Sequence, residues 1–118
     1  MELKSRSDRP REPTRSFSSK QERRVAEALG GRVQPNSGAT DFRKGDVEAG
    51  SFLVECKTRE RPSKSITLRR EWFDKLRDEA LFEGKRHTAL AFSFGDGESW
   101  YAVSEDVFKR VLELLDGR

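Results

Sequence analysis

The sequence is short of the residues that cross-link small proteins. Its 118 residues contain one cysteine and one histidine. One cysteine cannot form an internal disulfide bond. The single histidine, His87, has no cysteine or histidine partner nearby in sequence, so a zinc site is not expected. A lone thiol is typical of a reducing compartment, and we expect a cytoplasmic protein.

Long hydrophobic runs are also missing. Only 33% of the residues are hydrophobic and 38% are charged. No stretch approaches the roughly 20 apolar residues of a membrane helix, and no hydrophobic signal region follows the start. A chain of this length corresponds to one domain with a modest core. The composition predicts a soluble domain with no membrane partner.

Charge of one sign is not in large excess. The net charge is +3, from 24 basic and 21 acidic residues, so a nucleic-acid surface would need local clustering. The densest cluster is residues 57–70, with six cations and one acidic residue. A solvated loop is the alternative interpretation. Residues 1–16 lack an apolar period and predict a flexible, slightly basic arm before one domain over 17–118.

Periodicity and turn residues predict an α/β fold. Val25, Ala26 and Leu29 give one face of a first helix, which Gly30 ends. The order that follows is three short strands, a helix, two strands and a last helix. The expected ranges are a helix over 18–29, a short strand followed by a polar loop within 31–45, a hairpin over 45–58, a helix over 70–82, strands over 88–94 and 99–103, and a helix capped by Ser104.

The hairpin, GDVEAGSFLVECKT, places charge where a small core favours apolar residues. Glu55 and Lys57 are two apart on one strand and share a face, whereas Cys56 points to the core. A tight hairpin can bring Asp46 beside Glu55. Clustered carboxylates repel each other unless a cation lies between them. Oxygen ligands of this kind suit Mg²⁺ or Mn²⁺, although an exposed charged strand is the alternative.

Glu22, on the first helix, also has a structural and a functional interpretation. It shares the face of Val25 and Ala26. The pairs Ser18 with Gln21, or Ser19 with Glu22, fit a capping box, which would give Glu22 a structural role. The other interpretation is a functional carboxylate.

These residues together resemble the PD-(D/E)xK nuclease superfamily. That superfamily has a restriction-endonuclease-like core of helix, three strands, helix and strand, with an acid on the second strand and (D/E)-x-K on the third. GDV with Asp46 and ECK with Glu55 and Lys57 match this pattern. The chain is more closely similar to phage and archaeal Holliday junction resolvases, which add a glutamate on the first helix and a serine in the next loop. Glu22 and Ser37 fit those places, and the resemblance covers roughly residues 18–103.

The resemblance implies a role for each of these residues. Asp46 and Glu55 would hold the metal with the backbone carbonyl of Cys56, and Glu22 would complete the site directly or through water. Lys57 would position the attacking water, and Ser37 would contact the scissile phosphate. The implied activity is Mg²⁺-dependent cleavage of four-way DNA junctions, with Mn²⁺ able to substitute.

The basic residues near this site would bind the DNA backbone by shape. Those we expect to do so are Lys20, Arg23, Arg24, Arg59, Arg61, Lys64, Arg69 and Arg70. Two symmetric cuts imply a homodimer. Trp100, Phe108 and Leu112 are candidate interface residues, but core positions are the favoured interpretation for them.

The sequence departs from the family pattern in three places. Gly45 replaces the proline that often precedes the motif aspartate, Asp41 is a rival to Asp46, and the second helix lacks a glutamine. Alternative functions are another nuclease of the same superfamily, of repair or restriction type, or a non-catalytic DNA-binding module. An RNA-binding protein would leave the acidic cluster unexplained.

Overall fold

The computed structural model describes residues 12–34, 46–59 and 61–118, with side chains described from Lys20 onward. The order of helices and strands in these ranges is the one that the sequence predicts. The elements are α2 (Glu12–Leu29), β1 (Arg32–Val33), β2 (Asp46–Ala49), β3 (Phe52–Thr58), α3 (Arg70–Glu83), β4 (His87–Ser93), β5 (Ser99–Ala102) and α4 (Glu105–Asp116).

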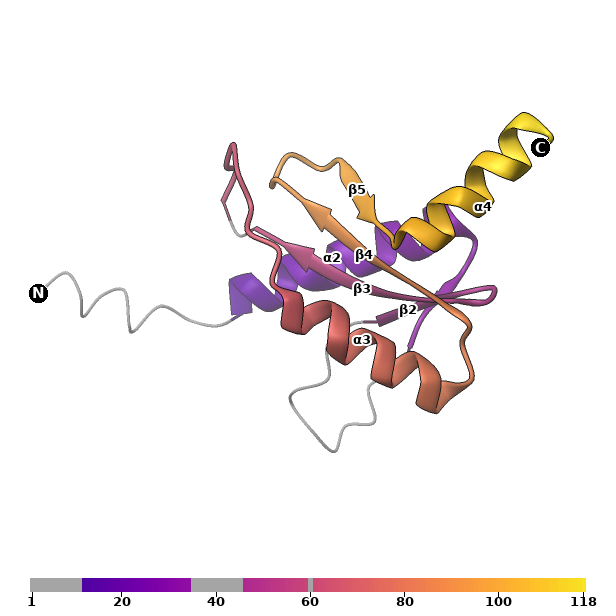
Figure 1. Ribbon diagram of the computed structural model, residues 1–118. Helices are drawn as coiled ribbons and strands as arrows, with labels where there is room; N and C mark the ends of the chain where they lie inside the picture. The colour runs from indigo at the N-terminus through magenta and orange to yellow at the C-terminus, as the bar shows by residue number, and fades with distance from the viewer. Residues whose placement is uncertain (1–11, 35–45, 60) are drawn as a thin grey trace, which may run out of the picture.

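The five strands form one mixed sheet in the order β1-β2-β3-β4-β5. Neighbouring strands are antiparallel except β3 and β4, which run parallel and are joined through α3. Figure 1 shows α2 and α3 on opposite faces of the sheet. The predicted α/β class, with helices flanking a mixed sheet, is therefore confirmed.

The β2–β3 hairpin closes at Gly50 and Ser51, as expected. Gly50 has φ of +59°, which favours glycine because it has no Cβ. The resulting register places Asp46 directly opposite Glu55 and Val47 opposite Val54. The turn therefore decides which side chains of the two strands meet.

Alternation along β3 divides the core into two clusters. Val54 and its sheet neighbours pack against Val25 and Ala26 of α2. On the other face, Leu53 packs against Leu76 and Ala80 of α3. Glu55 and Lys57 are two and four residues beyond Leu53, so they lie on the α3 face of β3.

Helix α2 begins at Glu12, earlier than the sequence predicts. Residues 12–16 of the predicted arm are therefore helical, and 1–11 lie outside the described residues. Ser18 and Ser19 are inside the helix, so the predicted capping box is wrong. Leu29, expected in the core, is 41% exposed because it lies in the last turn. Gly30 ends the helix with φ of +69°.

Helix α4 corrects another prediction. Ser104 caps it as expected, its hydroxyl accepting a hydrogen bond from the Val107 N–H at 3.2 Å. However, α4 has no buried residue. Trp100 and Phe108 are 49% and 53% exposed and Leu112 is half-buried, so these three are not core residues.

None of the helices in the described part of the chain is both long and apolar enough to cross a membrane.

Candidate metal centre

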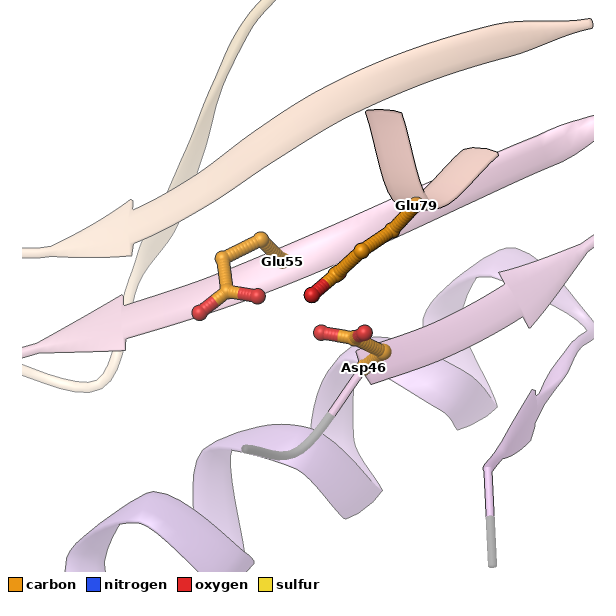
Figure 2. A group of neighbouring side chains, drawn as sticks. All are labelled: Asp46, Glu55 and Glu79. Atoms are coloured by element: carbon orange, nitrogen blue, oxygen red, sulfur yellow. The ribbon is translucent and has the colours of Figure 1, made fainter. Parts of the chain in front are cut away.

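Three carboxylates converge at one end of the β2–β3 hairpin. Asp46 comes from β2, Glu55 from β3 and Glu79 from α3, and one oxygen of each lies within 4.8 Å of the others. Figure 2 shows the three side chains pointing toward one another. The pairing of Asp46 with Glu55 agrees with the sequence prediction, whereas Glu79 was not foreseen.

Glu79 reaches the sheet because of how α3 packs. Leu76 and Ala80 are the buried residues of this helix and contact Leu53. Glu79 is three residues after Leu76 and adjoins Ala80, so it projects from the same side of the helix. Its spacing from Leu76 puts it on this side of the helix, but only the packing of α3 on the sheet brings it to Asp46.

Asp46 is the most enclosed member of the group. Asp46 is 1% exposed, and its Oδ1 has no hydrogen-bond partner in the described part of the chain. Burial raises the pKa of Asp46 to about 9, with hydrogen bonding to Glu55 and repulsion by Glu55 and Glu79 as further causes. The protein alone therefore favours a protonated Asp46 at neutral pH.

A hard divalent cation would fit this group of donors. A buried carboxylate oxygen without a partner is costly unless something binds it. Oxygen-only donor sets of one to three carboxylates, with room for water, suit Mg²⁺ and Mn²⁺ better than zinc. A cation would also offset the repulsion that raises the pKa of Asp46.

Lys57 is held beside the three carboxylates. Its Nζ lies 3.3 Å from Oε2 of Glu55 and 4.6 Å from the centroid of the Trp72 ring. The ring is at the start of α3 and offers the ammonium a favourable π face. Lys57 is 30% exposed, so its charge remains in reach of a ligand at the surface.

Glu22 lies near the site but outside the group of three. Its pKa is raised by burial and then by repulsion from Glu55. That interaction agrees with a functional position, and the start of α2 at Glu12 removes the capping alternative. Any contribution of Glu22 would act across water rather than in the inner group of carboxylates.

The side chain and the backbone carbonyl of Cys56 point in different directions. Its side chain packs with the α2 cluster, and burial raises the pKa of its thiol, as do the charges of Glu22, Glu55 and Asp46. The thiol is therefore no nucleophile. The Asp46 carbonyl accepts a hydrogen bond from the Gln34 N–H, so it points away from β3, and Asp46 and Glu55 are a pair without hydrogen bonds between them. Because such pairs alternate with hydrogen-bonded ones, the backbone carbonyl of the next residue, Cys56, points toward β2. This is the side on which Asp46 lies.

The predicted DNA-binding cations are all exposed. The set is Lys20, Arg23, Arg24, Arg59, Arg61, Lys64, Arg69 and Arg70. Arg69 pairs with Glu71 at 3.3 Å and Arg70 with Asp74 at 3.6 Å. The other cations of the basic stretch that follows β3 have no ion pair within the described part of the chain. They remain available for an anionic ligand.

Two residues of the sequence prediction cannot be placed. Ser37 lies outside the described residues, and so does Asp41. Asp41 and Asp46 were the two candidates for the metal-ligating aspartate. Only Asp46 can be placed, and it lies beside Glu55.

Comparison of the chain with protein-family models, with curated protein sequences and with solved structures finds no match.

Proposed function

We propose that this protein is a metal-dependent DNA endonuclease that resolves four-way junctions. The observation that carries the proposal is the register of β2 and β3. It sets Asp46 opposite Glu55, while Lys57 lies 3.3 Å from Glu55. Two acids can hold a divalent ion, and a lysine beside them can stabilise charge on a phosphate, so this set suits metal-dependent phosphodiester hydrolysis.

The order of elements supports the restriction-endonuclease-like core within this proposal. A helix, three strands, a helix and a strand precede the last hairpin strand, as in the superfamily that the sequence resembles. Asp46 lies on the second of the three strands, and Glu55 and Lys57 lie on the third. The superfamily has its acid and its (D/E)-x-K motif on the same two strands.

Asp46 and Glu55 would hold Mg²⁺, with the Cys56 carbonyl on the same side and Glu79 as a further carboxylate. Bound there, the ion supplies Lewis acidity toward a phosphate oxygen and a water of lowered pKa. Glu22 would accept a hydrogen bond from water at the rim of this site. Mn²⁺ would substitute, because it accepts the same oxygen donors.

Lys57 would act on the reacting phosphate rather than on the ion. Its ammonium donates hydrogen bonds and carries a positive charge, so it can orient the attacking water and stabilise charge that develops on the phosphate. Glu55 and the Trp72 ring fix it in place before substrate binds. Such preorganisation lowers the cost of reaching the transition state.

Branched DNA is the substrate that the surface supports best. The exposed cations between β3 and α3 follow the strand that carries Glu55 and Lys57, so a backbone bound there lies close to the site. Contacts of this kind recognise shape rather than sequence. A junction needs two cuts, and one chain has one site, so the active form would be a homodimer.

The test is cleavage of a labelled four-way junction and of a matched linear duplex with Mg²⁺. We expect paired nicks in the junction only, and a loss of about 10³-fold in the Glu55→Gln variant. Glu48→Gln is the matched control, because Glu48 lies on the same face of β2 but outside the group of three carboxylates.

The other outcomes separate the alternatives. Equal cutting of junction and duplex would leave a nuclease of the repair or restriction type. Binding without cutting, with Mg²⁺ and with Mn²⁺, would identify a non-catalytic DNA-binding module and refute the enzyme.

A further inference from the structure

Helix α4 has an apolar side that nothing covers in the described structure. Its apolar residues recur at helical spacing on one side, and its charged residues occupy the other. The apolar set is Val107, Phe108, Val111, Leu112, Leu114 and Leu115. None of them is buried. A contiguous exposed patch of this kind marks an interaction surface.

Exposure increases toward the tip of the helix. Val107, in the first turn, is half-buried and lines a cavity with Ala80 and Leu81 of α3. Leu114 and Leu115, in the last turn, are 83% and 77% exposed. Figure 1 shows α4 projecting away from the sheet. The patch is therefore open to a partner as large as another helix.

The charges of α4 select among possible partners. The helix carries four acidic residues, Glu105, Asp106, Glu113 and Asp116, and two basic ones, Lys109 and Arg110. An anionic membrane or a nucleic acid would be repelled by this excess, because surface-binding helices of that kind are rich in Lys and Arg. A second copy of the same helix has both signs to offer.

We infer that α4 pairs with α4 of a second copy of this chain, in antiparallel orientation about a two-fold axis near Val111 and Leu112. Phe108 of each chain then meets Leu115 of the other. All the exposed apolar residues enter one seam, as in an antiparallel coiled-coil pair. The same patch serves both subunits, which is what a closed dimer requires.

The charges favour this orientation over the parallel one. In the antiparallel pair, Lys109 comes beside the partner's Asp116, and Glu105 comes beside the partner's Arg118, which in each chain also pairs with its own Asp116 at 3.7 Å. Each contact occurs twice. In a parallel pair, every charge would meet its own copy, and the two helix dipoles would be aligned. The antiparallel pair therefore has attraction on its flanks where the parallel pair has repulsion.

This inference deepens the proposed function by giving the homodimer a specific interface, but its evidence is the exposure and the charges of α4 rather than the three carboxylates. The pairing lies away from the three carboxylates, on the element after β5. A dimer without nuclease activity would refute the proposed function and leave the interface standing. A monomer that cuts DNA would refute the interface and leave the nuclease activity standing.

The experiment is sedimentation velocity of the full chain over a range of concentrations, for wild type, Leu115→Glu and Glu113→Gln. We expect the wild type to form a dimer and Leu115→Glu to weaken it at least about ten-fold, because a charge in the seam must lose its water. Leu115 is 77% exposed, so the variant should fold, and circular dichroism checks this. Glu113 points away from the seam and should not change the dimer.

Cysteine cross-linking tests the orientation, in a Cys56→Ser background. Val111→Cys should form a disulfide-linked dimer on oxidation because the two copies meet at the axis. Leu115→Cys should not, since its copies are about 10 Å apart along the helix at 1.5 Å per residue. A wild type that stays monomeric, equal weakening by Glu113→Gln, or cross-linking through Leu115→Cys would each overturn the inference.

Discussion

Asp46 lies directly opposite Glu55 in the antiparallel pairing of β2 with β3, and both side chains are buried. Two carboxylates in this relationship destabilise each other when both are ionised. Glu79 approaches the same position from α3 and adds a third. The repulsion among these carboxylates costs stability, and a cation bound between them would offset that cost.

The first prediction concerns stability without metal. Asp46 has a pKa of about 9 in the folded protein, against 3.8 for an ordinary aspartate. The folded state thus holds a proton that the unfolded state releases, and the free energy of unfolding should fall as pH rises from about 4 to about 9. The slope should reach at most about 1.4 kcal/mol per pH unit. Chemical denaturation in EDTA at several pH values measures it.

Asp46→Asn is the control for this prediction. The amide does not titrate, so its unfolding free energy should be flatter over the same range and higher than wild type near pH 8. Parallel curves for the two proteins would show that Asp46 is already ionised in the folded state.

A second prediction concerns metal binding. The ion must displace the proton on Asp46, so the apparent affinity for Mn²⁺ should rise with pH, by up to about ten-fold per unit below pH 9. Glu79→Gln should lower it by about 10- to 100-fold. Glu83→Gln, one turn further along α3 and exposed, should leave it unchanged. Titration followed by the Mn²⁺ paramagnetic resonance signal measures the free ion directly and does not depend on catalysis.

Much of the fold was predictable because its signals are local. Gly50 with Ser51 fixed the hairpin, and a two-residue turn leaves one register in which Asp46 meets Glu55. Leu76 and Ala80 gave the buried side of α3 in the same way. Each of these depends on neighbours in sequence, so periodicity was enough to find them.

The parts that were missed depend on contacts between distant segments. Glu79 joins Asp46 across the face of the sheet, and nothing within α3 alone shows which of its acids points inward. The apolar side of α4 is typical of a core helix, because periodicity in the sequence shows that one side of a helix is apolar but does not show what covers that side. Core positions were thus favoured for Phe108 and Leu112, whereas the fold leaves Phe108 exposed and Leu112 half-buried.

Trp72 provides a third prediction. Its ring lies 4.6 Å from the Lys57 ammonium. Trp72→Leu should therefore slow junction cleavage about ten-fold while leaving Mn²⁺ affinity unchanged, because the lysine loses the π face that holds it and the carboxylates keep their own positions. Phe73→Leu, the neighbouring half-buried aromatic, is the control and should do neither. A parallel loss of metal binding in Trp72→Leu would mean that the ring supports the carboxylates instead.

The fourth prediction separates cations with and without an acidic partner. Arg61 and Lys64 are exposed and have no ion pair in the described ranges, whereas Arg70 pairs with Asp74 at 3.6 Å. Replacing Arg61 and Lys64 together by alanine should reduce the slope of log K against log salt for junction binding by about 2. Arg70→Ala should change it less, because its charge is already partly neutralised. Fluorescence anisotropy over a salt series gives the slopes, and an unchanged slope in the double variant would place the DNA elsewhere.

The last prediction concerns Gln21, which precedes Glu22 on α2. Gln21 is 1% exposed, and among the residues that the structure describes neither its amide nitrogen nor its amide oxygen has a hydrogen-bond partner. A buried amide without partners costs more than an apolar side chain of the same shape. Gln21→Met should therefore raise the free energy of unfolding by about 1 to 2 kcal/mol in EDTA, as measured by denaturation. If the same variant is instead less stable, and loses Mn²⁺ affinity as well, then the amide serves the metal centre through bound water, and Gln21 belongs with Glu22 to that site.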